Sequence, residues 1–273
     1  MYKNFKEFLA ERDAYLNEAR KSQNSGAKYK PKDRDELKAL VRDNSIHLGD
    51  IDISNVDNLR YVFSGSNRKD FSGIENWDVS HVTDMNHMFE DCENFNQPLN
   101  SWDVSSVIDM EGMFRYCSNF NQPLDKWNVK AVKDMHSMFE GCEKFNQPLN
   151  KWNVSNVSAM RSMFQGCKKF NQPLDKWNVS NVRDMSNMFK NCENFNQPLN
   201  NWDVSKVWSM NAMFQGCKKF NQPLDKWNVK AVTDNYWMFN GAKSFDQDLS
   251  VWRKKYRKNL TRLDPENESR FLN

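Results

Sequence analysis

A repeat of 25 residues constrains this chain more than any other feature of its sequence. Eight of the ten tryptophans stand 25 residues apart, from Trp77 to Trp252, and all six cysteines keep the same spacing, from Cys92 to Cys217. A fixed period of this length is typical of solenoid proteins, in which each repeat packs only on its neighbours. We therefore expect the chain to grow by stacking rather than to fold around one central core.

The pattern within one repeat predicts its local structure. In residues 99–105 apolar and polar residues alternate, which favours a short strand with one buried face. In residues 110–117 the apolar residues follow the i, i+3, i+4, i+7 spacing of a two-turn helix. The predicted fold is thus an α/β solenoid, a right-handed superhelix with one short parallel strand and one short helix per repeat.

The ends of the array depart from the pattern and divide the chain into three parts. Residues 1–48 read as a helical N-terminal cap, with an amphipathic helix over residues 3–21 and a second short helix after Pro31. Residues 49–250 form a solenoid of about eight repeats, of which the first is degenerate. Residues 251–273 are a basic C-terminal cap or tail, whose cluster at residues 253–258 could contact phosphate or an anionic membrane, or could be a solvated helix face.

Composition narrows the class of protein. The mean hydropathy of −0.89 and the 27% of charged residues would suit a disordered chain, but the Trp, Phe and Met stand at fixed positions where they can form a buried column. The net charge of +3 predicts no general attraction to nucleic acid. No stretch resembles a secretory signal or a transmembrane segment. On these grounds we expect a cytoplasmic protein, with a cell surface location or release by a signal-less route as the alternative.

The residue types suited to catalysis or metal binding lack the necessary spacing. None of the four histidines has a partner at metal-ligand or triad spacing, and His87 and His136 fall on predicted solvated faces. The cysteines read better as a ladder of small buried thiols than as disulfides. The repeated Asn-Gln pairs, of which Asn96 is the first Asn, could clamp a ligand, but their amides more readily satisfy backbone groups of the turns. We therefore expect no enzyme, no cofactor and no metal.

Two sets of residues are candidates for binding a partner. The first is a column of lysines expected on the concave strand face, which would suit an acidic protein or a glycan, or would simply be a solvated face that discourages edge pairing. The second is a group of aromatic residues at positions that are polar, small or charged in most other repeats. One of them, Trp237, could instead fold under the C-terminal cap. The two sets are Lys126, Lys151, Lys176 and Lys226, and Trp208, Tyr236 and Trp237.

The wording of the repeat, FNQPLxxWDVSxVxxMxxMFxxC, resembles the BspA-like leucine-rich-repeat surface proteins of bacteria. The resemblance covers roughly residues 50–250 and implies a curved solenoid that adheres to host or matrix proteins. This chain departs from such surface proteins in showing no export signal. The function expected is a non-catalytic, protein-binding repeat scaffold, with adhesion or host interaction implied by the resemblance. The alternative is a structural or assembly module that stacks on other copies or on a neighbouring domain.

Overall fold

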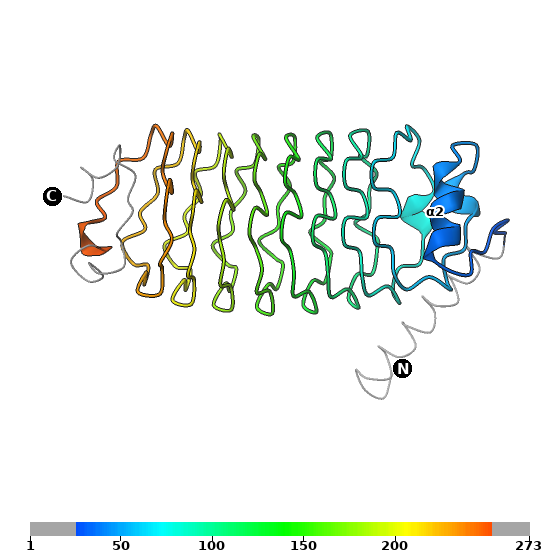
Figure 1. Ribbon diagram of the computed structural model, residues 1–273, viewed down its shortest axis with the longest axis horizontal. Helices are drawn as coiled ribbons and strands as arrows, with labels where there is room; N and C mark the ends of the chain where they lie inside the picture. Colours follow the sequence, from blue (N-terminus) through cyan, green and yellow to red (C-terminus); the bar gives the residue numbers. More distant parts are fainter. Residues whose placement is uncertain (1–25, 253–273) are drawn as a thin grey trace, which may run out of the picture.

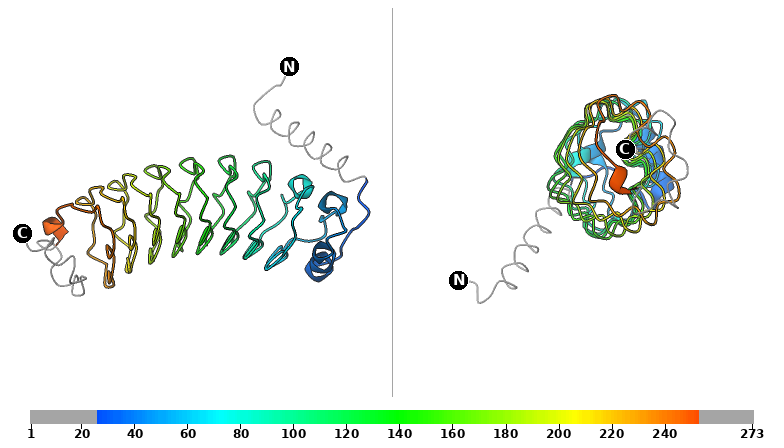
Figure 2. Two further views of the ribbon diagram at one scale, coloured as in Figure 1. Left: turned by 90° about the horizontal axis from the view of Figure 1, so that it is seen from above. Right: turned by 90° about the vertical axis from the view of Figure 1, so that its left-hand side faces the viewer.

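A computed structural model describes residues 26–252 of the chain. These residues wind into a row of coils stacked along one axis, and the coils nearly superimpose when viewed along that axis (Figures 1 and 2). We call each coil a rung; one rung corresponds to one 25-residue repeat. The amphipathic helix predicted at residues 3–21 and the basic cluster at residues 253–258 lie outside the described residues. The assignment to the leucine-rich-repeat class and the handedness of the superhelix stay predictions.

Helix α2 and two short 3₁₀ helices lie at the N-terminal end of the stack. Helix α2 spans Arg34–Arg42, where the sequence predicts a helix after Pro31. Asp33 caps its N-terminus, because the Asp33 side chain accepts a 2.9 Å hydrogen bond from the backbone N–H of Glu36. The helix buries Leu37 and Val41. Two single-turn 3₁₀ helices follow, η1 at Leu48–Asp50 and η2 at Ile74–Asn76. At the other end, residues 250–252 are helical.

The strand and helix predicted for each repeat are wrong. Between residues 77 and 249 the structure has turns and isolated parallel bridges, such as Asp109 to Asp134, with no helix or extended strand. The hydrogen bonds between rungs lie on the part of the repeat expected to be helical, since Gly112 N–H donates to the carbonyl of His136 (2.8 Å) and Phe114 N–H to that of Met138 (3.0 Å). We call residues 108–116, and the equivalent residues of each rung, the ladder segment.

Backbone conformation explains why the ladder segment is not a helix. Gly112 and Tyr116 both have positive φ, of 56° and 59°, and the equivalent residues of the other rungs do the same. Two left-handed residues in one short segment rule out a run of i to i−4 hydrogen bonds. Alternate residues turn their N–H groups toward the next rung instead, while the residues between them close tight turns, such as Met113 N–H to the carbonyl of Met110 at 3.2 Å.

The buried residues are those that the apolar pattern predicts. The repeated Leu, Trp, Val, Met, Phe and Cys side chains are at most 4% exposed and form one continuous core. Like side chains stack from rung to rung, with Phe114 and Phe139 ring centroids 5.7 Å apart and the Trp127 and Trp152 centroids 6.3 Å apart. Each rung therefore covers the apolar face of the one before it, as stacking requires.

Polar atoms of the framework also bond from rung to rung. All six cysteines are free and buried, which excludes the disulfide alternative, and each thiol approaches a backbone carbonyl, as Cys142 Sγ does at 3.0 Å from the carbonyl of Phe114. The side-chain oxygen of Asn121 accepts the backbone N–H of Asn146 at 2.9 Å. The same bond links the Asn of successive rungs from Asn96 onward. The Asn-Gln pairs therefore satisfy turn backbone, as expected.

Candidate functional site

The predicted lysine column is exposed but does not lie where it was expected. Lys126 and its equivalents stand in the turn just before the tryptophan of each rung, where the backbone N–H of Lys126 donates to the side-chain oxygen of Asn100 (3.0 Å). One of them, Lys151, lies 3.4 Å from the carboxylate of Asp125. No extended strand carries this column within residues 26–252, where the rungs pair through the ladder segment instead.

The three predicted aromatic residues all lie on ladder segments of two neighbouring rungs near the C-terminal end. Trp208 is 48% exposed, Tyr236 38% and Trp237 44%. The backbone N–H of Thr233 donates to the carbonyl of Trp208 at 2.9 Å, so the two rungs are paired at this point. The rings of Tyr236 and Trp237 lie 4.3 Å apart, centroid to centroid. We call these three residues the aromatic patch.

Trp237 combines the positive φ that its whole column shares with an unusually large side chain. Its φ is +55°, as at the equivalent residues Gly112, Ser137 and Ala212. A bulky side chain is rarely found in this conformation. Strained residues persist only where the surroundings impose them, and they cluster at functional sites. Four rungs fill this position with Gly, Ala or Ser, so a large exposed indole here is a feature that packing does not require.

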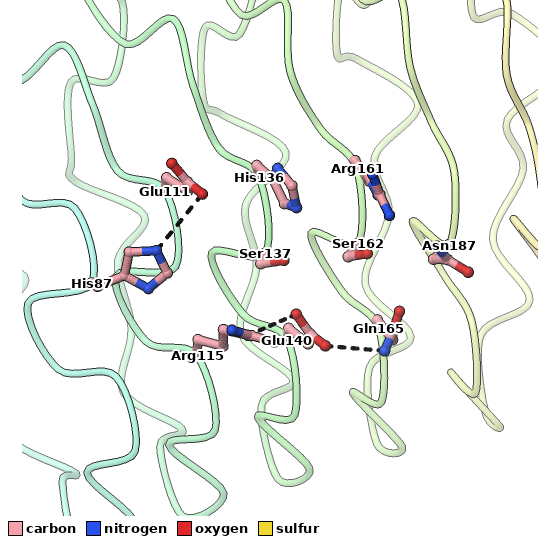
Figure 3. Close-up of a pocket in the computed structure, with 10 residues that line it drawn as sticks. All are labelled: His87, Glu111, Arg115, His136, Ser137, Glu140, Arg161, Ser162, Gln165 and Asn187. Atoms are coloured by element: carbon pink, nitrogen blue, oxygen red, sulfur yellow. Dashed lines mark hydrogen bonds and ion pairs between the residues drawn. The ribbon is translucent and has the colours of Figure 1, made fainter. Parts of the chain in front are cut away.

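A polar hollow of about 290 Å³ lies further toward the N-terminus, on the outer surface of the same ladder segments. Figure 3 shows its construction, which we call the trough. Small residues form its floor, Ser137 and Ser162, and longer side chains rise on both sides. His87 and Asn187 close the two ends. The two walls are formed by Glu111, His136 and Arg161 on one side and by Arg115, Glu140 and Gln165 on the other.

One carboxylate of the trough is fully engaged. Glu140 is only 6% exposed, and it accepts hydrogen bonds from Arg115 Nε (2.9 Å), the Tyr116 hydroxyl (3.2 Å) and Gln165 Nε2 (3.0 Å). Arg115 also bonds Glu90 on the preceding rung, at 3.1 Å. Burial is the largest single influence on the pKa of Arg115 and lowers it, but the attraction and hydrogen bonds to Glu140 and Tyr116 together outweigh burial, so the pKa is raised. This carboxylate holds rungs together and is not free to act as a base.

His87 is not the solvated surface residue that the sequence predicts. Its side chain is 11% exposed, stacks on the ring of Tyr61 at 4.9 Å, and lies 3.3 Å from Glu90 and 3.7 Å from Glu111. The close approach of Gly112 contributes to this placement, because a Cβ there would stand 2.3 Å from His87 Nδ1. The trough was missed from the sequence, although its signal is present: small residues stand at 112, 137 and 162 between larger ones in the same column.

The described residues offer little for catalysis or metal binding. Within residues 26–252 no group of three or more His, Cys, Asp or Glu is placed to hold a metal ion. Burial raises the pKa of the Cys142 and Cys167 thiols well above the ordinary value, which suppresses the thiolate needed for attack. Burial likewise raises the pKa of Asp134, a carboxyl of the ladder segment, with Asp109 and Glu111 adding to the effect.

Comparison with known proteins places the chain in a family. The family described as Mycoplasma protein of unknown function, DUF285, matches residues 36–149 and 160–264, and the chain belongs to it. The same family model matches two successive segments of the chain, which supports the tandem repeats. No curated protein and no solved structure matches the chain. Among the helices of residues 26–252, none has the length and apolar character to cross a membrane.

Proposed function

We propose that this protein is a non-catalytic scaffold that binds another protein through the aromatic patch. The observation that carries the proposal is the exposure of Trp208, Tyr236 and Trp237 on two adjacent rungs. Trp and Tyr dominate the binding energy of protein interfaces, because each supplies a large contact area at a small cost in conformational entropy. Nothing in the packing of the core accounts for three exposed aromatic rings here.

The lysine column is the weaker candidate for the main contact. Its members project from turns into solvent, and Lys151 is already within reach of Asp125. Exposed ion pairs add little to affinity. Such a column suits a supporting role, in which it attracts an acidic protein or glycan toward the rungs.

Catalysis is left out of the proposed function for a chemical reason. In the trough, where carboxylates and imidazoles gather, Glu140 accepts three hydrogen bonds and His87 lies between two glutamates. General acid–base work needs a group that can exchange a proton with substrate. The paired state of Glu140 favours a structural use of its charge.

Adhesion is the finer form of the proposal. It rests on the resemblance of the repeat to BspA-like surface proteins, which implies a host or matrix protein as the partner and a location at the cell surface. A cytoplasmic location would instead fit an intracellular partner of the same surface. Both locations leave the aromatic patch as the proposed contact.

Exchange of residues between equivalent positions of the rungs provides the test. Trp208→Thr, Tyr236→Asn and Trp237→Ser replace each aromatic residue with the one that another rung holds there, as in Thr233, Asn211 and Ser162. The combined variant should keep the melting temperature and lose binding to a panel of immobilised extracellular-matrix proteins. A control with Lys126→Ser and Lys176→Ser, which copy Ser101 of another rung, should retain most of the binding.

Two results would overturn the proposal in its present form. Equal binding by the aromatic variant would remove the patch from the interface, and loss in the lysine control alone would transfer the contact to the lysine column. Self-association of the wild-type chain that the same three substitutions abolish, measured by sedimentation, would favour the assembly module over the adhesin.

A further inference from the structure

The trough contains hydrogen-bond donors that no residue of the described chain uses. Ser137 and Ser162 are 5% and 6% exposed and line the floor, and their hydroxyl groups have no hydrogen-bond partner within residues 26–252. Arg161, on the wall beside them, forms no ion pair with any described residue. The imidazole of His136, on the same wall, likewise has no hydrogen-bond partner in that part of the chain.

The carboxylates near these donors are occupied elsewhere. Glu140 accepts from Arg115, Tyr116 and Gln165. Glu111 accepts the Asn86 amide at 3.0 Å and faces His87. The trough is thus divided along its length into an end where the charges are paired and an end, at Arg161, where they are not.

One column of acidic residues is interrupted beside His136. The position two residues before the His136 column holds Asp in five of seven rungs, as in Asp109, Asp134 and Asp234, but at residue 159 it is Ala. In two rungs this Asp accepts the amide of the residue that precedes it by 23 positions, on the preceding rung: Asp109 from Asn86 (3.4 Å) and Asp234 from Asn211 (3.2 Å). Ala159 therefore leaves His136 without an acid on the following rung, the rung of Arg161, while Asp134 remains on the rung of His136 itself.

We propose that the trough binds an oxyanion, a carboxylate or a phosphate group, between Arg161 and His136 and over the hydroxyls of Ser137 and Ser162. The guanidinium offers a planar, fork-shaped pair of donors that suits both groups. The two serines, on adjacent rungs about 4.8 Å apart, supply hydroxyls from beneath. Both hydroxyls line the hollow with no acceptor among residues 26–252, and an oxyanion would provide one. The site does not depend on the aromatic patch.

The histidine ring signals provide a direct readout. The chain has four histidines, so the full-length protein labelled with ¹³C-histidine gives a small set of ring signals, and a His136→Asn variant identifies that of His136. Titration with sodium phosphate or sodium acetate, at constant ionic strength, should shift the His136 signal saturably and leave that of His47, in the N-terminal cap, in place. Tighter binding of phosphate would assign a phosphoryl ligand, and equal or tighter binding of acetate would assign a carboxylate.

Matched substitutions separate the site from general charge effects. Arg161→Ser copies Ser186 of the next rung, and it should weaken binding roughly tenfold or more, since it removes charge-assisted hydrogen bonds. Ala159→Asp restores the missing acid and should prevent binding while Arg161 remains. The control Arg183→Ser removes the same charge outside the trough, copies Ser158, and should leave the affinity unchanged.

The proposal fails if neither anion shifts the His136 signal saturably. It also fails if Arg183→Ser weakens binding as much as Arg161→Ser, or if Ala159→Asp binds like the wild type. Far-ultraviolet circular dichroism and the melting temperature of each variant show that the rungs remain folded, so that a loss of binding reports on the trough.

Discussion

The indole Nε1 of Trp127 donates a hydrogen bond to the backbone carbonyl of Leu99, 2.8 Å away on the preceding rung. The same bond recurs at each tryptophan of the series, from Trp77 to Trp252. Each tryptophan therefore does two things: it fills the core and pairs a carbonyl that lies out of reach of water. The donor and the acceptor lie on neighbouring rungs, so this bond stabilises the interface between repeats. The stability of a stacked-repeat protein depends on the energy of such interfaces.

Replacement of one tryptophan should separate these two contributions. Trp152 is 3% exposed and donates to the carbonyl of Leu124 at 2.9 Å. Trp152→Ala should lower the free energy of unfolding by roughly 3–5 kcal/mol, as a large core truncation does. Trp152→Phe keeps much of the apolar contact and removes one of the two hydrogen bonds that the carbonyl of Leu124 accepts, the other coming from the backbone N–H of Trp127 at 3.1 Å. It should therefore cost only about 0.5–1.5 kcal/mol for the lost bond. Urea denaturation followed by circular dichroism measures both.

The exposed Trp208 supplies the control for this experiment. Trp208→Ala should cost less than about 0.5 kcal/mol, because the side chain is nearly half exposed. A surface-like loss for Trp152→Ala would mean that the inner and outer faces of the rungs have been exchanged.

The buried cysteine ladder should make the protein sensitive to alkaline pH. Burial raises the pKa of the Cys92 thiol to about 12 and that of Cys142 well above the ordinary value. An unfolded thiol ionises near pH 8.5, so above that pH the folded state retains protons that the unfolded state releases. Stability is complete below pH 8.5 and falls as the pH rises toward the folded-state pKa, by up to about 1.4 kcal/mol per pH unit for each thiol.

Cys142→Ser tests this dependence, because a serine hydroxyl does not ionise in the range and can still donate to the carbonyl of Phe114. We expect the slope of unfolding free energy against pH, measured between pH 9 and 11, to become shallower by the contribution of one thiol. An unchanged slope would show that Cys142 does not contribute to the alkaline transition.

The sequence predicts the inside of this protein better than its backbone. Every apolar column is buried, since burial depends on the periodic placement of side chains such as Met110 and Phe114. The same spacing predicts a helix only if each residue can adopt right-handed φ. Gly112 and Tyr116 have positive φ instead. The positive φ of Tyr116 is not predictable from the sequence, because a non-glycine residue rarely adopts it. The apolar residues at i, i+3, i+4 and i+7 are therefore buried by a segment of tight turns that bonds to the next rung, and not by a helix.

The candidate sites divide in the same way. Trp208 and Trp237 stand out in the sequence because they interrupt columns of small or polar residues, and their exposure agrees with that. The small residues at 112, 137 and 162 are visible in the sequence, but they indicate a trough only once Ser137, Glu140 and Arg161 are known to face the same way from adjacent rungs. That depends on the ladder segment, which the sequence indicates only after its left-handed residues are known. The sequence predicts the lysine column on a strand, whereas residues 26–252 carry it on turns.

The left-handed column also gives a prediction about glycine. Gly166 has φ of +76°, and a Cβ there would meet only the backbone of Gly141, at 3.5 Å. Space is sufficient, so the cost of a side chain is conformational. Gly166→Asn should be tolerated within about 1 kcal/mol, because Asn191 adopts φ of +60° at the equivalent position and Asn accepts this region readily. Gly166→Val should cost roughly 1–3 kcal/mol as a β-branched residue in a strained region.

The pair of variants gives its own control, since both add a side chain at the same place. If asparagine and valine lowered the unfolding free energy equally, steric contact rather than φ would be the cause, and the backbone conformation of this column would be in doubt.

The ion pair between Arg115 and Glu140 should stabilise the stack through the buried carboxylate. Glu140 is 6% exposed, whereas Arg115 is about one third exposed (32%). Arg115→Gln would leave the carboxylate of Glu140 with only the Tyr116 hydroxyl and the Gln165 amide. Loss of one partner of a fully buried pair costs about 3–5 kcal/mol. Solvent near Arg115 screens this pair, so we expect roughly 1–3 kcal/mol in urea denaturation.

A second substitution should recover most of that loss. Glu140→Gln copies Gln165 of the next rung, and Arg115→Gln copies the same residue, so the double variant places amides at three successive positions of one column. Amides can bond to one another without a buried net charge, and replacing both members of a buried pair is often nearly neutral. We therefore expect the double variant to be more stable than Arg115→Gln alone, with a coupling energy of about 1 kcal/mol or more in the double-mutant cycle. Simple additivity of the two substitutions would show that the pair does not act as a unit and that Glu140 is held by its other two donors.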